Sequence, residues 1–455
     1  MNQDIVILAA GKGSRMKSSF SKVLHKIGGT AMVRRVLTTA AELADAKLHL
    51  IIGHQGEQVE AACQDFSANI VWQNDPQGTG DALRRAAPSL SDQGATLTLY
   101  GDVPLIQSQT LEQMRALSTP NTLVLLTINL DNPTGYGRIV RNDQNQVVAI
   151  VEQKDANPEQ LAIQEVNTGI LLAPNGKLKG WLDALTNDNA QQEYYLTDII
   201  AMAAEQGVEI VTVQPEHEWE VAGVNDRVQL AALERIWQQQ QAETLMRNGA
   251  TLADPNRIDV RGELSTGYDC QIDINCVFEG KVTLGANVQI GPNCVLKNCT
   301  VADDTVIKAN TLIEDSQVGE ACDLGPFARL RPGTVLAKGA KIGNFVETKK
   351  AHIGEGSKVN HLSYIGDTQM GAGVNVGAGT ITCNYDGVNK STTVIGDKVF
   401  VGSNTSLVAP VEVQEGATIA AGSTITKNVK ADQLAFGRAK QMNKDGWARP
   451  TKKEK

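Results

Sequence analysis

Three short segments of the chain carry residue types that could do chemistry. The glycine-rich turn Gly11–Arg15 offers backbone N–H groups and two cations on which a polyphosphate could rest. Asp102 follows the apolar run Leu97–Tyr100 and could hold Mg²⁺, because Mg²⁺ binds through few carboxylates together with phosphate oxygens. His361 is one of only six histidines, and its imidazole could act as a general base near neutral pH.

Each of these features also has a structural explanation. A glycine-rich turn after a first strand is often only a turn, and the one at Gly11 has neither the Walker nor the dinucleotide-binding spacing. An aspartate after a strand can cap a helix, and a lone histidine on a repeat surface is often structural. Ligands of open α/β sheets bind at the carboxyl ends of the strands, however, which favours function at Gly11 and Asp102.

The first half of the chain has the pattern of an α/β domain. Short apolar runs alternate with amphipathic segments such as Met32–Ala41, and several runs are apolar at consecutive positions, as in strands covered on both faces. We therefore expect a mostly parallel, Rossmann-like sheet with helices on both sides. The predicted strands are Ile5–Ala9, Leu48–Ile52, Ile70–Trp72, Leu97–Tyr100, Leu123–Ile128, Val147–Val151, Ile170–Ala173 and Ile210–Val213.

The second half repeats every six residues. An aliphatic or aromatic residue recurs at this spacing, as at Ile272, Phe278 and Leu284, and glycine often follows it. A hexapeptide repeat predicts a parallel β-helix, in which short strands stack coil on coil. Three hexads would complete one triangular coil, so residues 18 apart, such as Cys276 and Cys294, should stack.

The repeat is weak between Leu296 and Val318 and breaks again between Thr382 and Ile395. The segment Cys383–Lys390 must leave the coil as a loop. Such loops often form the binding face of repeat proteins, although a loop without a binding role is the alternative.

The region between the two halves is predicted to be one long helix. Asp226–Arg247 has no glycine or proline and is rich in Ala, Leu, Gln and Glu. We therefore predict an α/β domain over residues 1–225, a linker helix over 226–248, and a β-helix with a C-terminal tail over 249–455.

Composition excludes several classes of protein. The net charge of −9 does not favour binding to nucleic acid or to an anionic membrane surface, so we expect neither as a partner. No apolar run approaches the ~18 residues of a membrane span, and none resembles a signal peptide. The seven cysteines lack disulfide-framework and zinc spacing, which favours reduced core residues in a cytoplasmic protein.

Leu8–Met16, followed by Lys22–Leu24, resembles the signature of sugar-1-phosphate nucleotidyltransferases. Together with the hexapeptide half, the order of parts resembles the bacterial family of bifunctional N-acetylglucosamine-1-phosphate uridyltransferases and glucosamine-1-phosphate acetyltransferases, over about residues 5–450. The resemblance implies a left-handed β-helix and a homotrimer. It also implies acetyl transfer from acetyl-CoA to glucosamine-1-phosphate, followed by uridyl transfer from UTP to N-acetylglucosamine-1-phosphate with release of pyrophosphate.

The resemblance implies the residues of a uridyl site in the first half. Asp102 and Asn225 would hold Mg²⁺, while Arg15 and Lys22 would act on the phosphates as catalytic cations. The other implied contacts are Gln73, Gly78 and Thr79 for uracil and Gly137, Glu152 and Asn167 for the sugar. Leu8, Ala9, Ala10, Gly11, Tyr100 and Gly101 are further implied substrate contacts of this site.

It likewise implies an acetyl site in the repeat half, with His361 as the general base that removes a proton from the substrate amine. The implied substrate contacts are Arg331, Lys349, Tyr364, Asn375, Asn384 and Tyr385. The implied acetyl-CoA contacts are Ala378, Ser403, Ala421 and Arg438.

Two residues depart from the family pattern near the uridyl site. Ser21 stands where proline is usual, and Asp81 stands where histidine is usual. Because Asp81 would lie near the nucleotide, the sequence does not determine the local charge there.

Two other functions remain as alternatives. One is a nucleotidyltransferase with another sugar or base. The other makes the β-helix a non-catalytic trimerisation scaffold, against which Arg331, Lys349 and His361 argue, because a scaffold does not need them.

Overall fold

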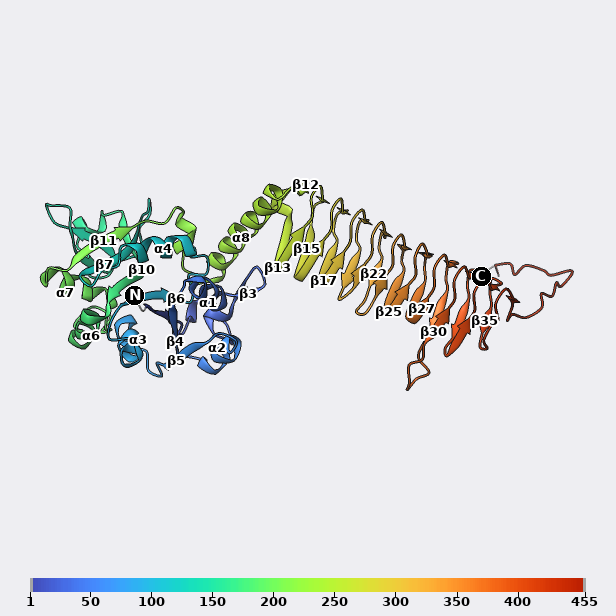
Figure 1. Cartoon of the computed structure of the whole chain (residues 1–455), viewed down its shortest axis with the longest axis horizontal. Helices are drawn as coiled ribbons and strands as arrows, with labels where there is room; N and C mark the ends of the chain where they lie inside the picture. The colour runs from blue at the N-terminus through green and yellow to red at the C-terminus, as the bar shows by residue number, and fades with distance from the viewer. Residues whose placement is uncertain (1–2, 453–455) are drawn as a thin grey trace. The chain divides into compact units, whose positions relative to one another are not determined.

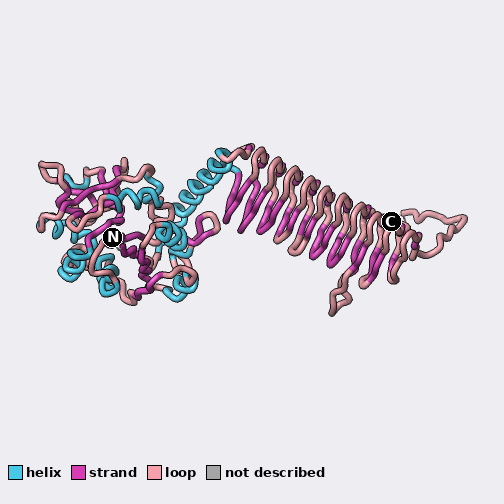
Figure 2. Tube along the Cα trace, viewed as in Figure 1, coloured by secondary structure: helices cyan, strands magenta, loops and turns pink. Residues whose placement is uncertain are grey.

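The computed structural model describes residues 3–452, which form two compact units that divide between residues 237 and 238 (Figure 1). The first unit mixes helices and strands, whereas the second is built almost entirely of short strands and turns (Figure 2). This boundary lies before residue 250, near which the sequence pattern places the change of architecture.

The first unit contains a nine-stranded sheet in the order β11-β7-β10-β6-β1-β4-β5, with β8 paired to β10 and β9. All eight predicted strands are present; β8 was missed, as was the separate two-stranded sheet of β2 (Lys26–Ile27) and β3 (Thr30–Ala31). The prediction of a mostly parallel sheet is correct for β5-β4-β1-β6 and for β7-β11, but β10 is antiparallel to both its neighbours. The strands are β1 (Gln3–Leu8), β4 (Ala46–Ile52), β5 (Ala68–Trp72), β6 (Ala95–Tyr100), β7 (Thr122–Asn129), β8 (Arg138–Arg141), β9 (Val147–Val151), β10 (Glu165–Pro174) and β11 (Glu209–Val213).

Helices cover both faces of this sheet, as predicted. Alternate residues of a strand point to opposite faces, so Ile5 and Ile7 belong to one apolar cluster and Val6 to the other. The first cluster includes residues of α1 (Met32–Glu42), α2 (Gly56–Cys63) and α4 (Ser108–Ala116). The second includes residues of α3 (Thr79–Ala86), α6 (Asn175–Ala184) and α7 (Ile199–Glu205). This double burial explains the consecutive apolar residues in the central strands.

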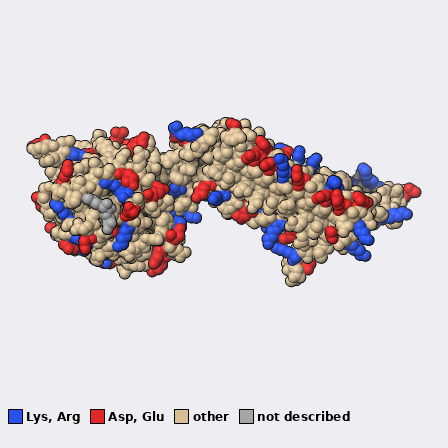
Figure 3. All heavy atoms as spheres, in the orientation of Figure 1, with Lys and Arg blue, Asp and Glu red and all other residues tan. Residues whose placement is uncertain are grey.

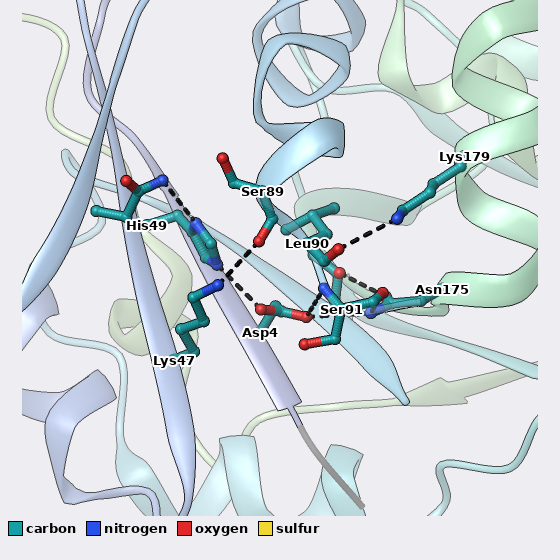
Figure 4. Close-up of polar contacts among 10 residues, drawn as sticks. Asp4, Lys47, His49, Ser89, Leu90, Ser91, Asn175 and Lys179 are labelled. Carbon is teal, nitrogen blue, oxygen red and sulfur yellow. Dashed lines mark hydrogen bonds and ion pairs between the residues drawn. The ribbon is translucent and has the colours of Figure 1, made fainter. Parts of the chain in front are cut away.

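A buried polar cluster lies at the amino-terminal end of β1, away from the strand ends that carry the predicted site (Figure 4). Asp4 accepts from the Ser91 amide at 2.9 Å, from Asn175 Nδ2 at 3.1 Å, and pairs with His49 Nε2 at 3.0 Å. Asp4 and His49 are fully buried. The cluster fastens the connection before β6 to the sheet, because each buried polar group finds a partner there.

The second unit is a parallel β-helix, which confirms the hexapeptide prediction. Leu324 pairs with Ile342, and Val277 pairs with Val295, so these coils return to register after 18 residues. Cys276 and Cys294 stack as expected, because the Val277 backbone amide donates to Cys294 O at 3.0 Å. Its eleven-stranded sheet lies along one side, and the fourteen-stranded sheet and its branches form the others. All seven cysteines of the chain are free thiols.

The weak stretch of the repeat is a change of period rather than an interruption. Ile290 pairs with Ile307 and Leu296 with Ile313, a step of 17 residues instead of 18. The coil therefore continues through this region with one residue fewer per turn, which shifts the phase of the apolar positions.

The helix α8 (Arg227–Arg247) agrees with the predicted long helix, and the boundary between the two units falls inside it. Leu233 packs in a cluster of the first unit, whereas Ala242 and Leu245 belong to the β-helix core.

Charges of both signs are interspersed on the visible face of each unit (Figure 3). Within residues 3–452, we find no helix long and apolar enough to cross a bilayer.

Candidate functional sites

The first candidate site is a cavity of about 420 Å³ at the carboxyl ends of the parallel strands of the first unit. Backbone hydrogen bonds gather the segments that follow these strands: the Gly101 amide donates to Leu8 O at 2.9 Å, and the Gln73 amide donates to Ile52 O at 2.8 Å. Ten predicted residues line it: Leu8, Ala9, Ala10, Gly11, Lys22, Gln73, Gly78, Thr79, Tyr100 and Asp102. The lining also includes Lys12, Val23, Pro76, Ala82 and Glu193, which were not among the predicted contacts.

Glycine is required where the first turn approaches Lys22. Gly13 has a φ of 56°, and a Cβ at this position would lie 2.5 Å from Lys22 Cβ. The turn can therefore place its backbone beside the lysine only because no side chain intervenes.

Two polar side chains from distant segments, those of Asp102 and Asn225, converge on the Lys22 ammonium group. Lys22 forms an ion pair with Asp102 and lies 3.4 Å from Asn225 Oδ1, which also accepts from Arg15 Nη2 at 2.9 Å. The Val224 amide donates to Asp102 O at 2.9 Å, and this bond holds Asn225 beside Asp102. A carboxylate and an amide oxygen thus face one cation, and oxygen donors of this kind are what a divalent metal such as Mg²⁺ prefers.

The three predicted sugar contacts form a second group beside the cavity rather than in its lining. The Asn167 amide donates to Gly137 O at 2.9 Å, and a Cβ on Gly137 would lie 3.4 Å from Glu152 Oε1. Burial raises the pKa of the Glu152 carboxyl, although Thr197 donates a hydrogen bond to it. Burial also raises the pKa of Tyr100, and the carboxylates of Asp102 and Glu152 raise it further, so this group adjoins the cavity through Tyr100.

The two departures from the family pattern are both buried. Ser21 has a φ of −54°, and its Oγ lacks a hydrogen-bond partner within residues 3–452. Asp81 accepts hydrogen bonds from Gln73, Arg84 and Arg85.

The second candidate site occupies two sides of the β-helix. His361 ends β26 (Lys358–His361) and is exposed, and its Nδ1 pairs with Asn344 Oδ1 at 3.2 Å. With that oxygen as acceptor, Nδ1 carries the proton of the neutral ring, and Nε2 remains able to accept one. Asn344 was missed, because only the register places it beside His361.

His361 belongs to a column that contains three of the predicted acetyl-CoA contacts. Backbone hydrogen bonds between successive coils define this column. The Gly379 amide donates to His361 O, the Asn404 amide to Ala378 O, and the Gly422 amide to Ser403 O. Ala421 completes the column, and its carbonyl accepts from Arg438 Nη1 at 2.7 Å. The predicted base and three of the predicted acetyl-CoA contacts therefore share one line of stacked coils, in the order His361, Ala378, Ser403 and Ala421, and the Arg438 side chain contacts the end of that line.

The cations of the second site lie on a different side of the β-helix from His361. They lie on the fourteen-stranded sheet, whereas His361 ends a strand of the eleven-stranded sheet. Arg331 donates to Glu347 at 2.7 Å, and this contact raises the pKa of the guanidinium. Lys349, in β25 (Glu347–Ile353), lies beside Lys390 and lowers the pKa of that lysine. Lys390 was missed as a site residue, although it lies in the predicted loop.

The remaining predicted contacts divide between the two sides. Tyr364 begins β27 (Tyr364–Met370) next to Glu347, and Asn384 donates to Asp367 of the same strand. Tyr385 bridges to Lys390 within the loop, whereas Asn375 lies on the side that carries His361. Among the described residues, no hydrogen bond joins His361 to the cations on the fourteen-stranded sheet.

Family models match three parts of the chain. A MobA-like NTP transferase domain matches residues 5–158, and six bacterial transferase hexapeptide repeats match residues 392–427. A third model, the GMPPB C-terminal domain, matches residues 260–347.

Full-length relatives settle the family. "Bifunctional protein GlmU" of Marinomonas sp. (strain MWYL1) is 78% identical over 453 residues, which cover 100% of both chains. The chain belongs to the GlmU family. GlmU of Marinobacter nauticus (strain ATCC 700491 / DSM 11845 / VT8) is 61% identical over 98% of this chain and 99% of its own.

Membership in the GlmU family confirms the predicted bifunctional enzyme, a uridyltransferase and acetyltransferase of UDP-N-acetylglucosamine synthesis, over the scaffold alternative.

Solved structures also match part of the chain. A nucleotidyl transferase from Methanothermobacter thermautotroptrophicus has 17% identity and a TM-score of 0.39, covering 52% of this chain and 98% of its own. A putative glucose-1-phosphate thymidylyltransferase from Bacillus anthracis has 18% identity and a TM-score of 0.41, covering 51% of this chain and 94% of its own.

Proposed function

We propose that the two candidate sites carry out two successive reactions. At the His361 column, acetyl-CoA acetylates glucosamine-1-phosphate; at the strand-end cavity, the product takes a uridyl group from UTP and pyrophosphate leaves. The observation that carries this proposal is the pairing of Asp102, Asn225 and Lys22 in one unit with an exposed, oriented imidazole in the other.

In the uridyl reaction, the chain's residues act mainly by positioning and neutralising charge. Asp102 and Asn225 would hold Mg²⁺ through the oxygens that now face Lys22, and when bound there it would neutralise charge on the triphosphate. Lys22 and Arg15 bind the phosphates, and the backbone of the glycine-rich turn supports them. Gln73, Gly78 and Thr79 bind the uracil, and Gly137, Glu152 and Asn167 orient the sugar.

In the acetyl reaction, His361 Nε2 takes a proton from the substrate amine as its nitrogen attacks the thioester carbon. The C–S bond then breaks and coenzyme A leaves as its thiol. Arg331 and Lys349 bind the sugar phosphate, as their charges suit. Tyr364, Asn375, Asn384 and Tyr385 orient the sugar, and Ala378, Ser403, Ala421 and Arg438 line the path of acetyl-CoA.

An aromatic and aliphatic ridge supports assembly as a homotrimer with sites between subunits. Phe327, Phe345 and Leu362 occupy the same corner of successive coils, are 49%, 55% and 63% exposed, and all have positive φ. Bulky residues seldom adopt this conformation, and exposed apolar patches mark protein interfaces. The ridge runs between the His361 side and the Arg331 side, so a second copy seated there would complete each acetyl site.

We place the enzyme in the cytoplasm, because acetyl-CoA and UTP are supplied there and because the cysteines are free thiols. The deciding experiment measures thiol release from acetyl-CoA with glucosamine-1-phosphate or N-acetylglucosamine-1-phosphate as acceptor. Release with the first only, and pyrophosphate release from UTP with the second only, is expected. Thiol release with neither acceptor would contradict the acetyl half of the proposal.

A further inference from the structure

A buried carboxylate, that of Asp81, contacts the side-chain amide of Gln73. Asp81 lies in the first turn of α3 and is 3% exposed, and Gln73, which lines the cavity, is 2% exposed. Gln73 Nε2 donates to Asp81 Oδ2 at 2.8 Å and to Gly78 O at 3.2 Å.

The direction of this amide is determined by chemistry. An ionised carboxylate and a backbone carbonyl can only accept hydrogen bonds, so both must face the NH₂ end of Gln73. Turning the amide over would place its carbonyl oxygen against two acceptors. Both amide hydrogens are thus used within the protein, and Oε1, which accepts no hydrogen bond from residues 3–452, is what Gln73 can offer to a ligand.

Two arginines keep Asp81 in its charged form. Arg84 Nη2 and Arg85 Nε donate to its two oxygens at 3.1 and 2.9 Å. Burial raises the pKa of Asp81, but the hydrogen bonds from Gln73, Arg85 and Arg84 outweigh it, and the pKa lies below its ordinary value. Arg84 in turn lies over the Tyr194 ring, 4.4 Å from its centroid, which limits its movement.

We propose that Asp81 is a specificity-determining positioning residue, which holds Gln73 so that the cavity accepts a pyrimidine with an N–H at ring position 3 and rejects one with a lone pair there. Uracil presents that N–H to Gln73 Oε1, whereas cytosine presents an acceptor and leaves two acceptors facing each other. The inference rests on the proposed binding of uracil by Gln73 and adds the residue that makes the choice.

The test compares Asp81→Asn with wild type, using kcat/KM for UTP and for CTP. An asparagine can donate to Gln73 Oε1, so only the Gly78 carbonyl, at 3.2 Å, still opposes turning of the amide, and the NH₂ group becomes able to face the base. We expect the UTP-to-CTP ratio to fall at least tenfold in this variant. Arg85→Gln is the matched control, because it removes a charge contact of Asp81 but keeps the Gln73 bond, and its ratio should stay within about twofold of wild type.

Each outcome decides the inference. Proportional losses for UTP and CTP in Asp81→Asn would mean that Asp81 only anchors the arginines, and would overturn it. Acetyl transfer and thermal unfolding check that the variant is folded. If it does not fold, N3-methyl-UTP with wild-type enzyme decides: a loss of at least a hundredfold against UTP supports the inference, and equal use overturns it. A wild-type enzyme that does not use UTP would instead refute the proposed function itself.

Discussion

Lys22 places its ammonium group against the carboxylate of Asp102, although 80 residues separate them in the chain. The contact is partly buried, and Asn225 Oδ1 lies on the same ammonium group at 3.4 Å. Two oxygen donors therefore face one cation at the edge of the sheet. A divalent metal bound there would displace the lysine toward the phosphates, where its charge is needed.

Replacing Asp102 with Asn should abolish uridyl transfer and leave acetyl transfer intact. The amide keeps the shape of the side chain but removes the negative charge that holds a divalent cation. We expect pyrophosphate release to fall at least a hundredfold, with thiol release from acetyl-CoA unchanged. Near-normal uridyl transfer would refute the metal-binding role of Asp102.

Replacing His361 with Ala should have the opposite pattern, with acetyl transfer lowered about 10²–10⁴-fold through loss of the general base and uridyl transfer retained. Equal loss of both activities would indicate misfolding rather than a second site.

Asn344 should act through His361, because its Oδ1 lies 3.2 Å from His361 Nδ1 and accepts the hydrogen bond from that nitrogen. We expect Asn344→Ala to lower kcat about tenfold. Asn344→Asp should restore activity and move the acidic limb of the pH–rate profile to higher pH, because a carboxylate stabilises the imidazolium form. An unchanged pH profile in Asn344→Asp would contradict this positioning role.

Glu152 should make the first unit less stable as pH rises. Burial raises its folded-state pKa above the unfolded value, so the folded state holds more protons between the two values and the free energy of unfolding falls across that window. Glu152→Gln removes the cost of burying the charge. Its unfolding temperature relative to wild type should therefore be higher at pH 7.5 than at pH 4.5, while the KM for the sugar phosphate rises. A constant difference at both pH values would disprove the linkage.

Phe345→Asp should dissociate the proposed homotrimer and abolish acetyl transfer. The ring stacks on Phe327 with centroids 5.4 Å apart, and a charge on the ridge would have to be desolvated when a second copy covers it. Light scattering measures the mass. Val228→Asp, at another exposed apolar position, is the control and should keep the wild-type mass. A Phe345→Asp protein of unchanged mass would exclude the ridge as the interface.

Ser21→Pro should stabilise the first unit by about 0.4–1 kcal/mol. The φ of −54° at this position already suits proline, and the substitution removes a buried hydroxyl that has no partner in the described part of the chain. Thermal unfolding of the two proteins under one condition checks this, and a lower unfolding temperature for the proline variant would contradict it.

Local patterns were enough to predict the two architectures and the main elements. Strands buried on both faces are continuously apolar, and a coil of three short strands needs an inward residue at every sixth position. The direction of β10 could not be predicted in this way, because an antiparallel strand buried on both faces has the same composition as a parallel one. The step from 18 to 17 residues per coil was likewise interpreted as a weak stretch of the repeat. The six-residue spacing of apolar residues shows where the repeat shifts along the sequence, but not which residues stack in space.

The residues of the candidate sites could also be predicted only in part from the sequence. Residue types and family motifs nominated Asp102, Lys22, Gln73 and His361, since their chemistry is a property of each side chain. The partners that orient them, Asn344 for His361 and Asp81 for Gln73, became visible only in the folded chain. Stacking and loop packing decide which polar atoms meet, and hydrogen bonds depend on distance and direction, which spacing along a sequence does not determine.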